Sequence, residues 1–318
     1  MDVLDHGVNM SRSRPGFTIT ELIVSMTILG LLVALTLPAV QRARESARRL
    51  TCTNHLKQWG LAMAQHCETH GSYPRGDNTF IDMLPGIGQG ALYNELTNLN
   101  SMSSEQINAI QFTVPEFICP DDPECPVRQG DGNYYPNEGT ILHDLAPTNG
   151  YDQVSQATQP RDVTDGFSHS AALAERLVGT PRASVSIAEM ERAPKRYFWF
   201  TQTRYGRAGE ELLAVKECRE RRTTPFPQFY SSNMVSYMTA GHYYNHLLLP
   251  NERACYNGPE DFNVEALLYL APPSSLHDGG VNILFLDGSV RFISEGLDET
   301  VWRALGTIHG NESVNYSF

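Results

Sequence analysis

The chain has 318 residues, which is enough for a long helix and one large domain or two modest ones. Its formal net charge is -12 at pH 7, from 24 Lys and Arg residues against 36 Asp and Glu residues. Because a nucleic-acid-binding protein needs a basic face, this acidic balance argues against a nucleic-acid partner.

Residues 17–40 form a long apolar run in which Glu21 is the only charged side chain. At about 1.5 Å per residue, a helix of this length crosses the roughly 30 Å hydrocarbon core of a bilayer. A secretory signal peptide has a shorter apolar core, so we predict a transmembrane helix over 17–40. A carboxylate is costly in hydrocarbon unless it is paired, which makes Glu21 a candidate functional residue.

The sequence Gly16-Phe17-Thr18-Ile19-Thr20-Glu21 at the start of this run resembles the cleavage and methylation site of type IV prepilins and pseudopilins. The resemblance implies that residues 1–16 are a leader, that a prepilin peptidase cuts after Gly16, and that Phe17 becomes the N-methylated N-terminus. It also implies that Glu21 meets the N-terminal amine of a neighbouring subunit during filament assembly. Pro38 stands where many pilin helices carry a proline. An ordinary uncleaved membrane anchor is the alternative, and Met10 is an alternative start.

Apolar residues continue beyond Pro38 at spacings of three and four residues, which indicates that the helix continues. We predict one helix from Phe17 to about His66, roughly 75 Å long, ended by Gly71 and Pro74. Its first half would lie in the membrane or filament core, and its second half would pack on a globular domain.

Basic residues gather in the second half of this helix, at Arg42, Arg44, Arg48, Arg49 and Lys57. Positive-inside counting alone would place them on the cytoplasmic side, opposite to a pilin's orientation. We give the cleavage motif more weight, because the leader also contains Arg12 and Arg14. The arginines then contact lipid phosphates or acidic groups of neighbouring subunits, or they form a solvated helix face.

The six cysteines suggest two disulfides outside the cytoplasm. Cys52 and Cys67 lie about 22 Å apart along one predicted helix, beyond disulfide reach. Cys119 and Cys125 close a short loop and are candidates for one disulfide, and Cys218 and Cys255 for a second. No Cys-x-x-Cys pair is present, so a zinc site is not predicted.

Further segments resemble a large family of bacterial pilin-like proteins that is known from planctomycete genomes as domain of unknown function 1559. The strongest match is residues 277–282 running into residues 286–293, and the others are residues 54–62, 71–74, 84–85 with 89–93, 117–123 and 163–168. The chain departs from the pattern at Trp59 and His169. Since the family has no established activity, the resemblance implies architecture more than function.

The predicted fold is α+β, with a long N-terminal pilin-type helix (17–70) packed on a β-rich domain (71–318). Loops and short helices occupy residues 74–160, including a helix at 103–111, and residues 223–259 are mostly irregular. Strands are expected at 171–177 and 196–203, and a helix at 298–305. Residues 281–286 and 289–293 flank Asp287-Gly288, which predicts a C-terminal hairpin with a type I′ turn.

Several chemistry-bearing residues have a simpler structural interpretation. His277, Gly279 and Gly280 form a turn in which the backbone comes close or takes positive φ, rather than a catalytic or metal site. Asp287 and Gly288 are turn formers. His242 and His246 lack a metal-binding pattern.

The acidic loop at Asp121, Asp122 and Glu124 allows calcium as a cofactor, but it matches no defined calcium loop and is interpreted as a solvated turn. No nucleophile elbow or phosphate-binding loop is present, so no catalytic residues are predicted.

We therefore predict a non-enzymatic, prepilin-like protein anchored in the bacterial inner membrane by one span, with its C-terminal domain extracytoplasmic. It would assemble into a type IV pilus or a type II secretion pseudopilus, or remain an anchored surface protein. Its partners would be the prepilin peptidase and methyltransferase, membrane lipid and other pilin-like subunits. The alternative is a ligand- or carbohydrate-binding module that uses the pilin-like helix for export.

Overall fold

The computed structural model describes residues 18–97, 114–123, 132–142, 148–152, 156–178, 186–207, 209–220, 225–226, 243–258 and 269–312. By internal contacts the chain divides into two units, residues 1–46 and 47–318, so the boundary falls within the first helix. The predicted leader and the predicted helix at 103–111 lie outside the described residues.

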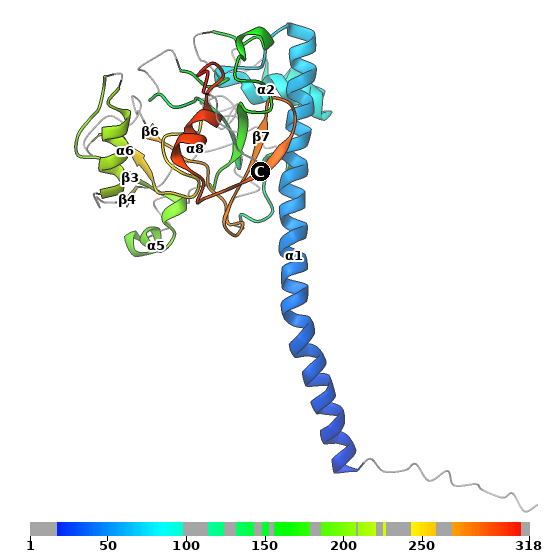
Figure 1. The fold of residues 1–318 in the computed structure, drawn as a ribbon. Helices are drawn as coiled ribbons and strands as arrows, with labels where there is room; N and C mark the ends of the chain where they lie inside the picture. The colour runs from blue at the N-terminus through cyan, green and yellow to red at the C-terminus, as the bar shows by residue number, and fades with distance from the viewer. Residues whose placement is uncertain are drawn as a thin grey trace, which may run out of the picture. The chain divides into compact units, whose positions relative to one another are not determined.

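Helix α1, Ile19–His70, confirms the long N-terminal helix (Figure 1). In the first unit its side chains between 19 and 40 are all exposed. An 18-residue window of this stretch has a mean hydropathy of 2.3, so the helix is long and apolar enough to cross a membrane.

Pro38 lies inside α1 and contributes no backbone N–H to the helix. Gly71 ends the helix with φ 75° and donates its N–H to the Cys67 carbonyl oxygen at 2.8 Å.

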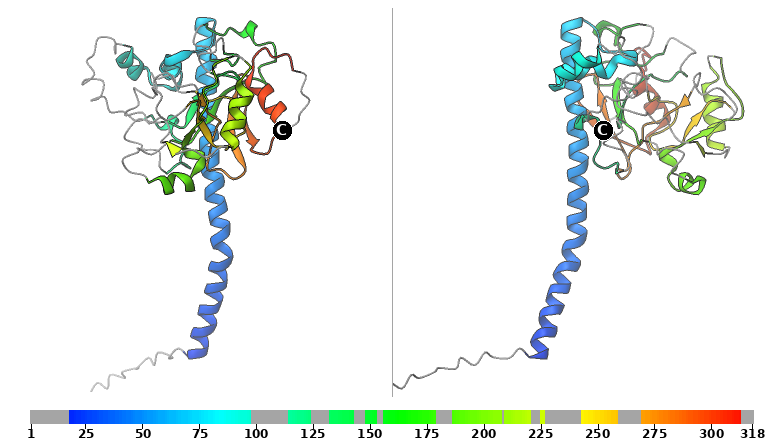
Figure 2. Two further views of the ribbon diagram at one scale, coloured as in Figure 1. Left: turned by 90° about the vertical axis from the view of Figure 1, so that its left-hand side faces the viewer. Right: turned by 180° about the vertical axis from the view of Figure 1, so that it is seen from behind.

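In the second unit, α1 supplies part of the hydrophobic core. Its buried residues there are Cys52, Leu56, Trp59, Gly60, Ala62 and Met63. The indole of Trp59 packs against the rings of Phe80 and Phe117, at centroid distances of 5.4 and 4.5 Å. A Cβ at Gly60 would lie 2.8 Å from Leu284 Cδ1, so glycine lets the helix approach the sheet closely. Figure 2 shows the strands and short helices grouped around this part of α1.

In the residues that the structure describes, the second unit contains two four-stranded sheets. The first has the order β1-β2-β7-β8, is antiparallel throughout and comprises Tyr134–Pro136, Ala171–Glu175, Gly280–Phe285 and Val290–Ser294. The second has the order β4-β3-β5-β6, is mixed because β3 and β5 are parallel, and comprises Pro225–Phe226, Phe198–Phe200, Ala254–Tyr256 and Tyr269–Leu270. The antiparallel sheet and the α+β class are confirmed, whereas the second sheet was not predicted beyond β3.

Short helices fill the connections. Among the described residues, the α-helices after α1 are α2 (Thr79–Met83), α3 (Gly90–Leu96), α5 (Ile187–Arg192), α6 (Glu211–Glu220) and α8 (Glu299–Gly306). The 3-10 helices in the same part of the chain are η1 (Gly76–Asn78), η2 (Leu84–Ile87), η4 (Pro115–Phe117), η5 (Pro160–Asp162) and η7 (Pro194–Arg196). Helix α8 confirms the predicted C-terminal helix, and Asp298 caps it by accepting hydrogen bonds from the N–H groups of Thr300 and Val301.

The predicted hairpin is present as β7 and β8, but the predicted type I′ turn is wrong. Asp287 does not have positive φ, whereas Gly288 does, at 79°. The Gly288 N–H donates to the Phe285 carbonyl oxygen at 2.9 Å, and the Phe285 N–H donates to Ser289. This pattern is a three-residue loop with glycine at its last position, and it needs only one residue of positive φ.

Candidate functional site

The N-terminal end of α1 is the first candidate site. Gly16 and Phe17 lie outside the described residues, and the description begins at Thr18. The Glu21 carboxylate accepts hydrogen bonds from the Thr18 backbone N–H at 2.9 Å and from its hydroxyl at 2.7 Å. The Glu21 N–H donates in return to Thr18 Oγ1 at 3.3 Å. Within a single chain, Glu21 therefore caps the helix at the residue that follows the predicted N-terminus.

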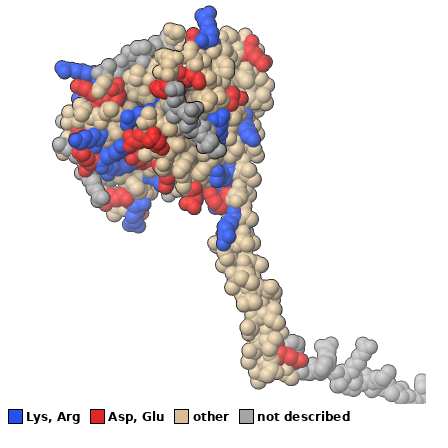
Figure 3. Space-filling view, in the orientation of Figure 1, with Lys and Arg blue, Asp and Glu red and all other residues tan. Residues whose placement is uncertain are grey.

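The surface of this end of the molecule is apolar. From Leu22 to Val40 the helix carries no Lys, Arg, Asp or Glu side chain, and the stretch is a nearly continuous tan surface in Figure 3. Exposed fractions of its leucines and isoleucines exceed one half, for example 61% for Leu29 and 67% for Leu35. Such a surface is stable only against lipid or other apolar helices.

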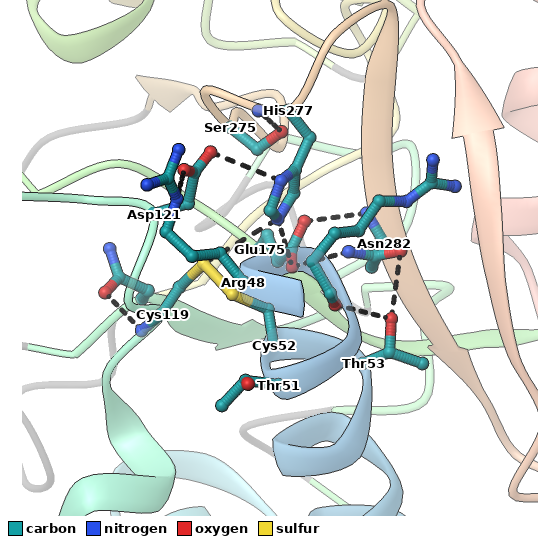
Figure 4. Close-up of polar contacts among 12 residues, drawn as sticks. Arg48, Thr51, Cys52, Thr53, Cys119, Asp121, Glu175, Ser275, His277 and Asn282 are labelled. Atoms are coloured by element: carbon teal, nitrogen blue, oxygen red, sulfur yellow. Dashed lines mark hydrogen bonds and ion pairs between the residues drawn. A yellow bond between two sulfur atoms is a disulfide. The ribbon is translucent and has the colours of Figure 1, made fainter. Parts of the chain in front are cut away.

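The second candidate site is a buried polar cluster around His277 (Figure 4). We use "the His277 cluster" for Cys52, Cys119, Asp121, Glu175 and His277. Cys52 comes from α1, Cys119 and Asp121 follow η4, Glu175 ends β2, and His277 precedes β7. All five side chains are at most 9% exposed.

His277 lies between two carboxylates and a sulfur atom. Its Nδ1 is 3.3 Å from Asp121 Oδ2, and its Nε2 is 3.4 Å from Glu175 Oε1 and 3.7 Å from Cys119 Sγ. The His277 backbone N–H donates to Ser275 Oγ at 3.2 Å, and this hydroxyl donates to the Gly280 carbonyl oxygen. The turn around Gly279 and Gly280 thus fixes the backbone that carries the imidazole.

Each carboxylate of the cluster is also held by a further residue. Arg48 Nε donates to Asp121 Oδ1 at 2.7 Å. The Asn282 backbone N–H and side-chain amide donate to the two oxygens of Glu175, both at 2.8 Å. Buried charges are costly unless paired or hydrogen-bonded, and these partners meet that requirement.

The interpretation of the acidic loop as a solvated turn is wrong. Asp121 and Asp122 are 9% and 4% exposed. Arg196 donates to Asp122 Oδ1 at 2.7 Å, and Asn133 Nδ2 and the Val178 N–H donate to its Oδ2. The carboxylates of Asp121 and Asp122 are therefore buried and paired with Arg48 and Arg196 of the chain itself. Glu124 lies outside the described residues.

The predicted pairing of Cys119 with Cys125 is also wrong. Cys119 forms a disulfide with Cys52, 67 positions earlier in the chain, and the Cα–Cα distance is 5.0 Å. The physical reason is tertiary, because the packing of α1 against the loop after η4 brings these two cysteines within bonding distance. Cys218 and Cys255 form a second disulfide, and Cys67 is a free cysteine. Cys125 lies outside the described residues.

The basic residues of α1 in the second unit are not a uniformly solvated face. Arg48 pairs with Asp121, as described, and the Arg49 guanidinium lies 3.6 Å from the centroid of the Phe292 ring.

The glycines and His246 have structural environments. Gly279 has φ 79°, and a Cβ at Gly280 would lie 2.1 Å from the Ile293 carbonyl oxygen, so neither position suits a side chain. The Asp287 carboxylate accepts a hydrogen bond from the Ser289 N–H at 2.8 Å, as a turn former does. His246 is buried, with its ring nitrogens near the Trp302 carbonyl oxygen and the Tyr244 hydroxyl. His242 lies outside the described residues.

Comparison with known protein families gives two matches, which cover different parts of the chain. Residues 41–300 match the family model described as Protein of unknown function (DUF1559). Residues 11–37 match the model described as Prokaryotic N-terminal methylation motif. No curated protein and no solved structure matches the chain. The two matches confirm the resemblances that the sequence suggested.

Proposed function

The chain belongs to the DUF1559 family of proteins of unknown function, and we propose that it is a structural, prepilin-like subunit that assembles through Glu21. Its methylation motif and its long apolar helix are those of a prepilin-like, membrane-anchored protein. The observation that carries the proposal is the position of Glu21, which is the only charged residue of an exposed apolar helix surface and lies four residues after Phe17.

Processing is the first step of the proposal. A prepilin peptidase cuts after Gly16, and Phe17 becomes an N-methylated terminus. The cut leaves a positively charged amine on Phe17, four residues before Glu21 in the sequence. The apolar surface from Leu22 to Val40 holds the chain in the membrane before assembly.

Assembly is the second step of the proposal, and in it the charged Glu21 carboxylate becomes buried. When the apolar helices of neighbouring subunits pack together, Glu21 leaves the polar membrane surface and its carboxylate needs a cationic partner. The amine of Phe17 in an adjacent subunit supplies that partner, replacing the hydrogen bonds that Thr18 makes to Glu21 within one chain. The mechanism is packing, without a catalytic step. The filament is a type IV pilus or a secretion pseudopilus.

The orientation of the chain is part of the proposal. We place the second unit outside the cytoplasm, with α1 as a single pass of the inner membrane. Disulfides persist in oxidising compartments, so the pairs Cys52–Cys119 and Cys218–Cys255 support this side.

Substitution of Glu21 tests the proposal. In the Glu21→Ala variant we expect normal membrane insertion and normal cleavage but loss of the subunit from sheared filaments. Glu21→Gln keeps the shape without the charge and should fail in the same way, whereas Ser25→Ala, one turn along the helix, should assemble normally. Wild-type incorporation of Glu21→Ala would overturn the proposed role of this residue.

A cavity favours ligand binding as a second candidate function. It has a volume of about 320 Å³, at the lower end of the range for ligand sites, and lies where α1 meets α2, η2 and α3. His66, Asp82 and Tyr93 are among its lining residues. Burial lowers the pKa of His66 and raises that of Asp82.

Thermal denaturation of the full-length protein in detergent, with and without a panel of oligosaccharides, tests this second candidate. A rise in Tm that disappears in Asp82→Asn but not in Asp278→Asn would support it. An unchanged Tm with every sugar would leave the structural role as the only candidate of the two.

A further inference from the structure

The His277 cluster brings together four side chains that are ligands for transition metals. Sulfur atoms of Cys52 and Cys119, a carboxylate oxygen of Glu175 and a ring nitrogen of His277 all lie within 4.8 Å of one another, and all four residues are buried. They come from four separate parts of the chain, which explains why no Cys-x-x-Cys pattern marks them in the sequence.

We propose that, when the Cys52–Cys119 disulfide is reduced, these four side chains bind one zinc ion. Thiolate, imidazole and carboxylate are all zinc ligands, and two thiolates, one imidazole and one carboxylate supply the four that a closed tetrahedral site needs. The disulfide observed in the structure is the metal-free state of the same site.

The spacing of the atoms fits this geometry. Zinc bond lengths of roughly 2.0 to 2.3 Å place the ligand atoms of a tetrahedral site roughly 3.3 to 3.8 Å from one another. His277 Nε2 lies 3.4 Å from Glu175 Oε1 and 3.7 Å from Cys119 Sγ, so three of the four ligand atoms already have these separations around Nε2. The sulfurs of Cys52 and Cys119 are bonded to each other in the disulfide, and reduction lets them separate to a similar distance.

The proposed ligands are held by further polar residues, in the way that metal ligands in proteins commonly are. Metal-binding histidines commonly donate their second N–H to a carboxylate, and Asp121 lies 3.3 Å from His277 Nδ1 for this role. Arg48 fixes that carboxylate from its other oxygen, and Asn282 fixes both oxygens of Glu175. The imidazole and the carboxylate are therefore oriented before any ion arrives.

The redox step balances. A dithiol reductant transfers two electrons and two protons to the disulfide, which becomes two thiols, while the dithiol becomes a disulfide. Binding of Zn²⁺ then releases the two thiol protons to solvent. A disulfide oxidant reverses the step: it takes two electrons from the two thiolates and two protons from solvent and becomes a dithiol, while Cys52 and Cys119 form their disulfide again, so that two of the four ligands are lost and the ion is expelled.

Cobalt(II) binding to the full-length protein in detergent tests the proposal, because cobalt replaces zinc and reports its ligands by absorption. The protein is reduced without oxygen by a phosphine, which takes an oxygen atom from water, and is titrated with Co²⁺ and then Zn²⁺. We expect one Co²⁺ per reduced chain, with the visible bands of a tetrahedral site and a near-ultraviolet thiolate charge-transfer band. Zinc should abolish both, and the oxidised protein should show neither.

Variants separate this site from the other cysteines. The bands should be lost or altered in Cys52→Ala and His277→Gln, and should be unchanged in Cys67→Ala and in the double variant Cys218→Ala, Cys255→Ala. X-ray absorption of the zinc-loaded wild type needs no variant, and should give two sulfur ligands at about 2.3 Å and two lighter ligands at about 2.0–2.2 Å. The proposal is overturned if the reduced wild type binds no Co²⁺, or if Cys52→Ala gives the wild-type spectrum.

Discussion

Arg48 on α1 and Asp121 in the loop after η4 form an ion pair with an N–O distance of 2.7 Å. The disulfide Cys52–Cys119 joins the same helix to the same loop one turn further on. A third contact is the indole N–H of Trp59, which donates to the Glu116 carbonyl oxygen at 2.8 Å. The second half of α1 is thus fixed to η4 and the loop after it by ionic, covalent and hydrogen-bonding contacts.

The Cys52–Cys119 disulfide should stabilise the second unit strongly. It closes a loop with a sequence separation of 67, for which chain entropy predicts about 4 kcal/mol. We expect the double variant Cys52→Ala, Cys119→Ala to lose roughly this free energy of unfolding in urea denaturation. Cys67→Ala removes a cysteine without a disulfide and should change it far less. An equal loss in both variants would contradict the account.

Trp59 should be a main contributor to the core, because its side chain is fully buried against Phe80 and Phe117. Trp59→Ala is expected to cost about 3–5 kcal/mol in free energy of unfolding. Trp59→Phe keeps most of the packing but loses the hydrogen bond to Glu116, and should cost clearly less. Urea denaturation measures both, and equal costs would show that the aromatic packing is not the main term.

The division of the chain predicts where a soluble fragment must begin. Residues 47–318 retain Cys52, Leu56, Trp59 and Met63 and should give a cooperative thermal transition with dispersed NMR signals. Residues 72–318 lack this part of the core and should be unfolded or aggregated. A well-folded 72–318 fragment would contradict the packing described for α1.

Two glycines of the C-terminal hairpin should respond differently to alanine. A Cβ at Gly280 would meet the Ile293 carbonyl oxygen at 2.1 Å, so Gly280→Ala must displace β8 and should cost about 1–3 kcal/mol or more. Gly288 has open space around it but φ 79°, so Gly288→Ala carries only the backbone cost of about 1 kcal/mol. Thermal denaturation of both variants should rank them in this order, and the reverse order would refute the close strand approach.

His246 should make the protein less stable in acid. Burial lowers the pKa of His246 to about 3, against about 6.5 for an unfolded histidine. Between these values the unfolded chain binds one more proton, so this contribution is complete above about pH 6.5 and falls by roughly 1.4 kcal/mol per unit as the pH decreases. The slope of unfolding free energy against pH should flatten in His246→Phe but not in His169→Gln, where the histidine is exposed. The same slope in His246→Phe would show that other groups cause it.

Elements with a local signal were predictable from the sequence. The long apolar run gave α1, and Asp298 followed by an apolar repeat gave α8. The hairpin was found from Asp287-Gly288, but the loop holds three residues rather than two, since the register pairs Leu284 with Val290. The pattern of the sequence does not distinguish these two loops.

Features that depend on distant parts of the chain were not predictable in this way. The length of the predicted helix excluded a disulfide between Cys52 and Cys67 but left the other partners of Cys52 open. Cys119 and Cys125 are close in sequence, which favoured a disulfide between them, whereas the tertiary structure pairs Cys119 with Cys52. Strands of two or three residues, as in the second sheet, are too short to show a period. Glu175 and Asn282 belong to separate strands, and only the sheet places them beside His277.

Prepilin processing of the chain fixes the N-terminus of the mature protein, and identification of that N-terminus is the first experiment to do. Intact-mass measurement and N-terminal peptide sequencing of the protein from its native membrane should give a chain that begins with N-methylated Phe17. A mature chain that retains Gly16 and the residues before it would contradict prepilin processing, and with it the role proposed for Glu21.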